Sequence, residues 1–283
     1  MSDADLKFGI LFAGSNPDLG EPALALERDT RLVLLLDDLG YDCAWFSENY
    51  IGNFYSTDTA KLPASRIGEK TRGIMLGTFL SALHYRHPSA LADRIREIAS
   101  RHGPEIELSV ASQISPAGAK VAGSLGLPLL SLCATAPGDF NALAISWAIY
   151  ERNSGKNPVE RSQWSLAGPV HIAETREQAF GNVRYGLENW IGNFRDVKAP
   201  PFAPADTANA AKALVESGQA VIGTADDAIL QIERLLEQSG GFGAFLQLAH
   251  NWANWDETKK SYQLFSRYVA PAFQISDSKN LTS

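Results

Sequence analysis

The stretch "VASQISPAG" (residues 110–118) joins a buried strand to the start of a helix. The strand, "IELSVAS" (106–112), is an apolar run of ordinary strand length, and Ser115-Pro116 follows it. Proline in the first turn of a helix leaves the neighbouring backbone N–H groups free, and Ser115 adds a hydroxyl. This pattern is typical of a βα unit, and it predicts either an anion site or a plain serine cap.

The same alternation continues in both directions along the chain. Strands are predicted at 8–13, 43–47, 74–82, 106–112, 127–132, 167–173 and 243–249. Helices are predicted between them, with Pro22 opening one, Gly40 closing it, and Thr224 and Asp227 forming a capping box for another. An open doubly wound sheet is the alternative to a barrel, but no G-x-G-x-x-G follows the first strand. We therefore predict a (β/α)8 TIM barrel in one domain, residues 1–283, although eight strands are needed and only seven are recognisable.

Composition excludes several classes of protein. The chain has 283 residues, 45% of them hydrophobic, and a formal net charge of −7, which does not fit a nucleic-acid-binding surface. No apolar run approaches the ~20 residues of a membrane helix, and the acidic N-terminus is unlike a signal peptide. Cys43 and Cys133 sit in apolar stretches and are expected to be core residues. We expect a cytoplasmic protein that uses no metal, membrane or nucleic acid.

Polar residues gather where predicted strands end, which is where barrel enzymes place their working groups. Glu48 could be a base, a cofactor ligand or half of a structural ion pair. His84 and His87 are spaced as H-x-x-H, but a zinc site would need a third ligand. His250 precedes Trp252, and this segment could either line a pocket for an apolar ligand or pack against the last helix.

Four segments in this order resemble the bacterial-luciferase-like, flavin-dependent monooxygenase family, and most closely its limonene-monooxygenase-like branch. The segments are "GYDCAWFSEN" (40–49), "IMLGTFLSALHYRHPSALADRI" (74–95), "VASQISPAGAKVAGSLGLPLLSL" (110–132) and "VIGTADDAILQIERLLEQSGGFGAFLQLAHNWANWDETKKSYQLFSRYVAPAF" (221–273). The resemblance implies a barrel that binds FMN at its carboxyl-terminal mouth, and a homodimer. It also implies that a separate NAD(P)H-dependent flavin reductase supplies FMNH2, and that a C4a-peroxyflavin oxygenates a hydrophobic small organic molecule.

The resemblance also assigns cofactor contacts. Thr78 matches a position beneath the flavin ring, while Ser112, Ser115 and the backbone at Gly118 match the phosphate site. A cis peptide bond, which the family often has at the end of the third strand, is expected near Thr78–Phe79.

The catalytic positions implied by resemblance are Glu48, Asn49 and His250. Asn49 stands where the family commonly has a histidine, and an asparagine cannot take up a proton at neutral pH. Either His250 or His84 takes over that role, or oxygenation is impaired. Two alternatives stay open: a deazaflavin-dependent oxidoreductase on the same fold, and a non-catalytic partner subunit similar to the luciferase β chain.

One part of the family pattern is absent. By resemblance, a fourth βα unit and a long adjoining loop should precede the strand at 106–112, but only "RHGPE" (101–105) stands there. A natural deletion would open the barrel and expose two strand edges, which proteins avoid. We therefore predict a chain discontinuity near His102–Gly103, with the fourth unit missing from this chain.

Overall fold

A computed structural model describes residues 5–13, 22–47, 67–81, 93, 107–112, 116–132, 135, 142–156, 158–192 and 209–274. The strands are β1 (Lys7–Phe12), β2 (Cys43–Ser47), β3 (Met75–Ser81), β4 (Glu107–Ser112), β5 (Leu129–Leu132), β6 (Trp164–Gly168), β7 (Val170–Ile172), β8 (Val221–Gly223) and β9 (Ala244–Leu248). The longer helices are α1 (Pro22–Asp38), α5 (Ala117–Leu125), α6 (Ala142–Asn153), α7 (Arg176–Val183), α8 (Leu187–Gly192), α9 (Ala210–Glu216), α10 (Ala225–Ser239) and α11 (Trp255–Leu264). The short helices are η4 (Arg161–Gln163), the π-helical η5 (Phe265–Val269) and η6 (Ala270–Phe273).

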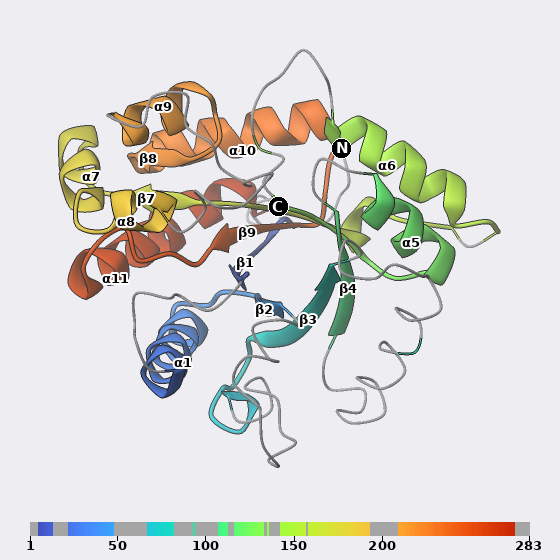
Figure 1. Cartoon of the computed structure of the whole chain (residues 1–283), viewed down its shortest axis with the longest axis horizontal. Coiled ribbons are helices and arrows are strands. Elements are labelled where there is room, and N and C mark those ends of the chain that lie inside the picture. Colours follow the sequence, from blue (N-terminus) through green and yellow to red (C-terminus); the bar gives the residue numbers. More distant parts are fainter. Residues whose placement is uncertain are drawn as a thin grey trace, which may run out of the picture.

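Seven of the described strands form a closed parallel barrel in the order β1-β2-β3-β4-β5-β6-β9 (Figure 1). Following paired residues around the ring from Leu11 of β1 leads back to β1 at Lys7, four residues earlier. On the way the path moves forward by another four residues along the intermediate strands, so the total stagger is eight residues. This is the stagger of an ordinary eight-stranded barrel. Spread over seven strands, it corresponds to a strand tilt of about 40°.

The predicted TIM-barrel-like fold is confirmed, but the described strands close the ring with seven rather than eight, and the argument that a natural deletion would leave the barrel open is wrong. β3 pairs directly with β4, in the register Phe79↔Ser109, and β6 pairs with β9, so the ring closes without a further strand. A missing βα unit consequently exposes no ladder groups between β3 and β4. The join predicted at His102–Gly103 lies outside the described residues.

The predicted strand at 167–173 is split at Pro169. β6 stays in the barrel, whereas β7 leaves it and pairs in parallel with β8, a strand that sequence periodicity did not predict (Figure 1). The other edge of β7 is closed by side chains. Ser261 Oγ accepts from the Ile172 amide at 2.9 Å, and His250 Nε2 donates to the Val170 carbonyl at 3.1 Å.

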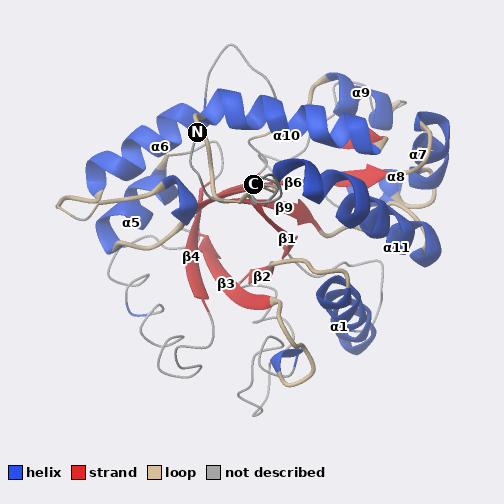
Figure 2. Ribbon diagram, turned by 180° about the vertical axis from the view of Figure 1, so that it is seen from behind, coloured by secondary structure: helices blue, strands red, loops and turns tan. Residues whose placement is uncertain are grey.

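The barrel wall has two different faces. Helices pack against the outer face (Figure 2), which carries large side chains: Phe8, Ile10, Phe12, Phe46, Val110, Leu129, Trp164 and Phe245. The inner face carries Leu11, Cys43, Trp45, Phe79, Ala111, Leu130, Leu132, Ala167, Leu246 and Leu248. The two sets alternate along each strand, as side chains on a pleated strand must.

Several helix ends follow the predicted signals. Gly40, with φ of 78°, adopts the left-handed conformation just after α1. Thr224 and Asp227 form the expected capping box of α10. No helix in the described part of the chain is long and apolar enough to span a bilayer.

Candidate active site at the carboxyl ends of the strands

The junction of β4 with α5 has the predicted form. α5 begins at Ala117, directly after Ser115-Pro116, and Pro116 at the N-cap makes no side-chain capping bond. Ser115 itself lies outside the described residues. An N-terminal turn with no side-chain cap from its N-cap residue offers N–H groups to an anion.

Gly118 allows this helix to approach the strand closely. A Cβ at this position would collide with the Ala111 carbonyl oxygen and come within 2.7 Å of Ser112 Cα. Ser112, the last residue of β4, is almost fully buried beneath the first turn of α5. Gly118 therefore positions the helix terminus, while the predicted phosphate contacts of Ser112 and Gly118 remain predictions.

Thr78 lies in the barrel wall and faces outward. Its hydroxyl donates to the Phe46 carbonyl at 3.0 Å, and it pairs with Phe46, whose side chain belongs to the outer face. This differs from the expected position beneath a flavin ring, because alternation along β3 turns Phe79 inward and Thr78 outward. The expected cis peptide bond at Thr78–Phe79 is also absent, as it is from every described residue.

His250 is buried, with 5% of its surface exposed, and both ring nitrogens are engaged. Nε2 donates to the Val170 carbonyl, Nδ1 accepts from the Trp252 amide at 3.4 Å, and the ring stacks on Trp252 at 4.3 Å. Burial, reinforced by the nearby His171, lowers the pKa of His250 to about 3. His250 is thus neutral, and it would have to release one of these bonds to act on a bound molecule.

Two interpretations were open for this segment, a pocket lining or a packing surface, and the surroundings of Trp252 favour packing. Trp252 is fully buried and meets the Trp190 ring edge-on at 5.3 Å. The preceding residue, Asn251, lies close to Gly186, and a Cβ added to Gly186 would collide with the Asn251 carbonyl oxygen. The segment after β9 therefore packs against α8 and the turn that precedes it, as well as against β7.

A second buried histidine was not singled out from the sequence. His171, in β7, has no exposed surface, and burial lowers its pKa to about 4. Its Nε2 lies 3.3 Å from Asn182 Nδ2, which also donates to Glu257 at 3.0 Å. The ring centroids of His171 and His250 are 6.2 Å apart. The only sequence signal was a histidine inside an apolar strand.

The remaining predicted residues are either outside the described part of the chain or in the core. Glu48, Asn49 and His84 lie outside the described residues. Among the described residues there is no cluster of histidine, cysteine and carboxylate side chains suited to a metal ion. Cys43 is a buried free thiol whose pKa is raised by burial to about 12, so it is a core residue as expected.

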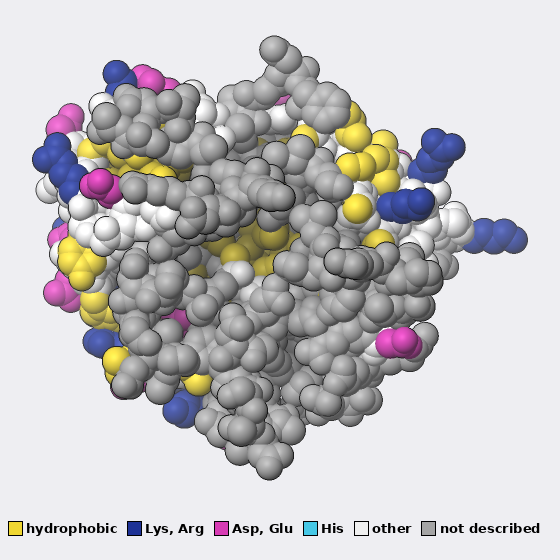
Figure 3. All heavy atoms as spheres, in the orientation of Figure 1, with side chains coloured by type: hydrophobic (Ala, Val, Ile, Leu, Met, Phe, Trp, Pro, Cys, Tyr) yellow, Lys and Arg dark blue, Asp and Glu magenta, His cyan; other side chains and the backbone are white. Residues whose placement is uncertain are grey.

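The inner face supplies the lining beneath the mouth. The last inward-facing residues of β2, β4 and β6 are small (Ser47, Ala111 and Ala167), whereas β5 and β9 contribute Leu132 and Leu248. Figure 3 shows hydrophobic side chains in a hollow at the centre of one face, where β1 and β9 lie in Figure 1. Such a surface accommodates apolar groups.

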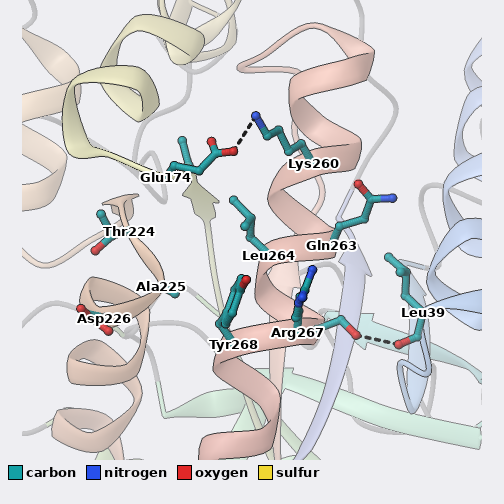
Figure 4. Close-up of a pocket in the computed structure, with 12 residues that line it drawn as sticks. Leu39, Glu174, Thr224, Ala225, Asp226, Lys260, Gln263, Leu264, Arg267 and Tyr268 are labelled. Carbon is teal, nitrogen blue, oxygen red and sulfur yellow. Dashed lines mark hydrogen bonds and ion pairs between the residues drawn. The ribbon is translucent and has the colours of Figure 1, made fainter.

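A separate groove of about 850 Å³ lies on the outside of the barrel, between the start of α10 and the helix α11–η5 (Figure 4). Its charged groups are of both signs, and Lys260 pairs with Glu174 at 2.7 Å across one end. Arg267 lies beside the Tyr268 ring, 5.3 Å from its centroid. None of the predicted site residues lines this groove, so it is not the predicted flavin site.

Comparisons with known proteins agree with this fold. The sequence profile of the luciferase-like monooxygenase family matches residues 6–100. Limonene 1,2-monooxygenase of Rhodococcus erythropolis is 30% identical over 334 residues, covering 94% of this chain and 86% of the relative. 4-Hydroxyprotoasukamycin monooxygenase of Streptomyces nodosus subsp. asukaensis is 25% identical, covering 95% and 92% respectively. The first alignment is longer than this chain of 283 residues, so the relative has positions with no counterpart here.

Two solved structures illustrate the range of the fold. The oxygenating constituent of 3,6-diketocamphane monooxygenase from Pseudomonas putida, in complex with FMN, matches with a TM-score of 0.71 at 17% identity, covering 96% of this chain and 99% of the other. An F420-dependent secondary alcohol dehydrogenase matches with a TM-score of 0.60 at 14% identity, covering 96% and 100%. At these identities the likeness shows a shared fold.

Proposed function

The chain belongs to the luciferase-like monooxygenase family, and from that premise we propose that it is an FMN-dependent monooxygenase acting on a hydrophobic small organic molecule. Reduced FMN, supplied by a separate NAD(P)H-dependent flavin reductase, would provide the two electrons. One atom of O2 would enter the substrate and the other would leave as water. The observation that carries the proposal is the helix start of α5, packed on the end of β4 at the mouth.

The residues at this junction fit a phosphate group. Pro116 cannot cap the helix with a side chain, and Gly118 brings the first turn against the strand end. The Ser115 hydroxyl and the N–H groups of that turn would hold the phosphate, and bonds to an anion are roughly twice as strong as neutral ones. The apolar inner face would receive the substrate, since Ala111, Ala167 and Leu248 offer it no polar group.

We expect Ser115→Asp to weaken FMN binding about tenfold or more, because the new carboxylate would repel the phosphate. Quenching of flavin fluorescence during titration measures this. The matched control is Ser124→Asp, which places the same charge on the exposed face near the other end of α5 and should leave the affinity within a few-fold. Equal FMN affinity in both variants and the unaltered chain would exclude this phosphate site.

Asn49 favours the two alternatives, since it cannot serve as the proton acceptor that the family commonly has there. If the protein is a deazaflavin-dependent oxidoreductase, F420 will bind more tightly than FMN in parallel titrations. If it is a non-catalytic subunit, it will co-purify with an active relative and will show no turnover alone. A homodimer that consumes FMNH2 and O2 with an apolar substrate argues against both.

A further inference from the structure

The helix α5 packs through its backbone against neighbours on two sides. At its start, Gly118 brings the helix against the end of β4. Five residues further on, a Cβ added to Gly123 would collide with the Tyr150 carbonyl oxygen and come within 3.1 Å of Asn153 Cβ, both in the last turn of α6. Glycine at position 123 therefore lets α5 lie closer to α6 than any larger residue would allow.

Both neighbours of α5 are held in place by other contacts. β4 pairs with β3 on one side and with β5 on the other. On α6, the Trp147 ring stacks on Trp164 of β6 with centroids 5.2 Å apart, and the Arg161 guanidinium lies 4.2 Å from the Trp147 centroid. A larger side chain at position 123 would therefore move α5 rather than β4 or α6.

The far end of α5 is fixed as well. Gly126, with φ of 66°, ends the helix in the left-handed conformation, and the Leu127 amide donates to the Ala122 carbonyl at 3.0 Å. Only residues 126–128 connect the helix to β5, and the Val110 amide of β4 donates to the Pro128 carbonyl at 3.0 Å. A push at Gly123 would therefore tilt the helix about this end, and the first turn would move most because it lies farthest from it.

We propose that Gly123 is a positioning residue for the flavin phosphate, because its contact with α6 sets where the first turn of α5 meets that phosphate. This inference rests on the proposed function, in which the first turn of α5 holds the phosphate of FMN. A hydrogen bond weakens steeply as its angle falls, so a small tilt of the turn is enough to weaken the bonds to the phosphate. Gly123 acts through the position of α5 alone.

The test compares FMN with riboflavin, which has the same ring system and ribityl chain but no phosphate. Both are titrated into the unaltered chain and into Gly123→Ala, with the quenching of flavin fluorescence as the readout. In Gly123→Ala the affinity for FMN should fall about tenfold, the loss of roughly one charge-assisted hydrogen bond. The affinity for riboflavin should stay nearly the same, because riboflavin makes no phosphate bond to that turn.

Gly181→Ala is the matched control. It makes the same substitution inside another helix, α7, where an added Cβ would meet nothing within 4 Å. It should leave the ratio of FMN affinity to riboflavin affinity unchanged. Should Gly123→Ala fail to fold, Trp147→Phe alters the packing of α6 on the barrel and leaves the sequence of α5 intact, and it should lower the same ratio to a smaller degree.

The outcomes separate this inference from the proposed function. If the unaltered chain prefers FMN to riboflavin and Gly123→Ala keeps that preference, Gly123 does not position the phosphate site, while the proposed function stands. An equal loss of both affinities in Gly123→Ala would likewise overturn the inference, since it would show a general structural role. If the unaltered chain has no preference for FMN, the phosphate site of the proposed function fails, and this inference fails with it.

Discussion

The closed barrel and the β7–β8 sheet are continuous through one strand, yet they satisfy their backbones in different ways. In the barrel every strand has a neighbour on both sides, so N–H and carbonyl groups pair with backbone. Among the described strands, β7 pairs with β8 alone. On its other side, Ser261 and His250 stand in for the missing strand.

The difference shows that an edge strand can be protected by single side chains from distant helices and loops. The barrel strands are joined by many similar backbone hydrogen bonds, so neighbouring bonds hold a strand in place when one bond is lost. The edge of β7 depends on two side chains, one of which can titrate. We therefore expect the barrel to respond to changes in packing volume, and the edge of β7 to respond to changes in polarity and pH.

The largest expected effect is in the barrel. Trp164 is fully buried on the outer face, stacks on Trp147 at 5.2 Å, and donates to Ser131 Oγ at 3.0 Å. Trp164→Ala should lower the free energy of unfolding by about 3–5 kcal/mol because it leaves a large cavity. Urea denaturation measures this, and a loss below about 1 kcal/mol would contradict the dependence on volume.

Acid, taken from pH 7 to 5.5, should act next most strongly, at the edge of β7. The pKa values of His171 and His250 are lowered from the usual 6.5 to about 4 and about 3, so the unfolded chain binds protons that the folded chain excludes. Stability is then complete above pH 6.5 and falls below it, by about 1.4 kcal/mol per pH unit for each histidine until its folded pKa is reached.

The measurement is the pH dependence of the free energy of unfolding between pH 7 and 5.5. His171→Gln keeps a polar side chain but removes one titration, so its slope should be shallower by about one proton. An unchanged slope would show that His171 does not exclude protons in the folded chain.

A smaller effect is expected at Ser261. Ser261→Ala removes the acceptor of the buried Ile172 amide and should lower the free energy of unfolding by about 1–3 kcal/mol. Hydrogen exchange at Ile172 should accelerate in parallel. The control is Ser266→Ala, which removes a hydroxyl that donates to the less buried Leu39 carbonyl, and it should cost less.

The smallest effect is expected at an exposed ion pair of α9. Lys212 Nζ lies 3.6 Å from Glu216 Oε1, and each side chain is more than half exposed. Lys212→Ala should change the free energy of unfolding by no more than about 0.5 kcal/mol, since solvent and salt screen the pair. A loss as large as that of Ser261→Ala would break the contrast between buried and exposed polar groups.

Local signals in the sequence were enough to predict much of the barrel wall and one part of the candidate site. The buried runs at 43–47 and 243–249 are the strands β2 and β9, and Ser115-Pro116 correctly marked the start of α5. Alternation along β3 also predicts an outward Thr78, since Leu76 and Leu80 share its face, whereas the resemblance alone predicts a position beneath a flavin ring.

What could not be predicted depends on contacts distant in the chain. How many strands close a barrel is decided by registers between strands, which no single strand encodes. β8 has only three residues, too few for a period. The partner of His250 is Val170, eighty residues earlier, so its role as a substitute for a strand had no local signal.

The eight-residue stagger over seven strands also fixes the radius of the barrel. At ordinary strand spacing, seven strands enclose a radius about 0.6 Å smaller than eight strands with the same stagger. A narrower tube holds less side-chain volume per layer, which agrees with Gly9 and Gly77 lying against Cys43 and Trp45 inside it. Enlarging this lumen by trimming side chains soon leaves voids, so inserting a βα unit between β3 and β4 is the route that widens the circumference itself.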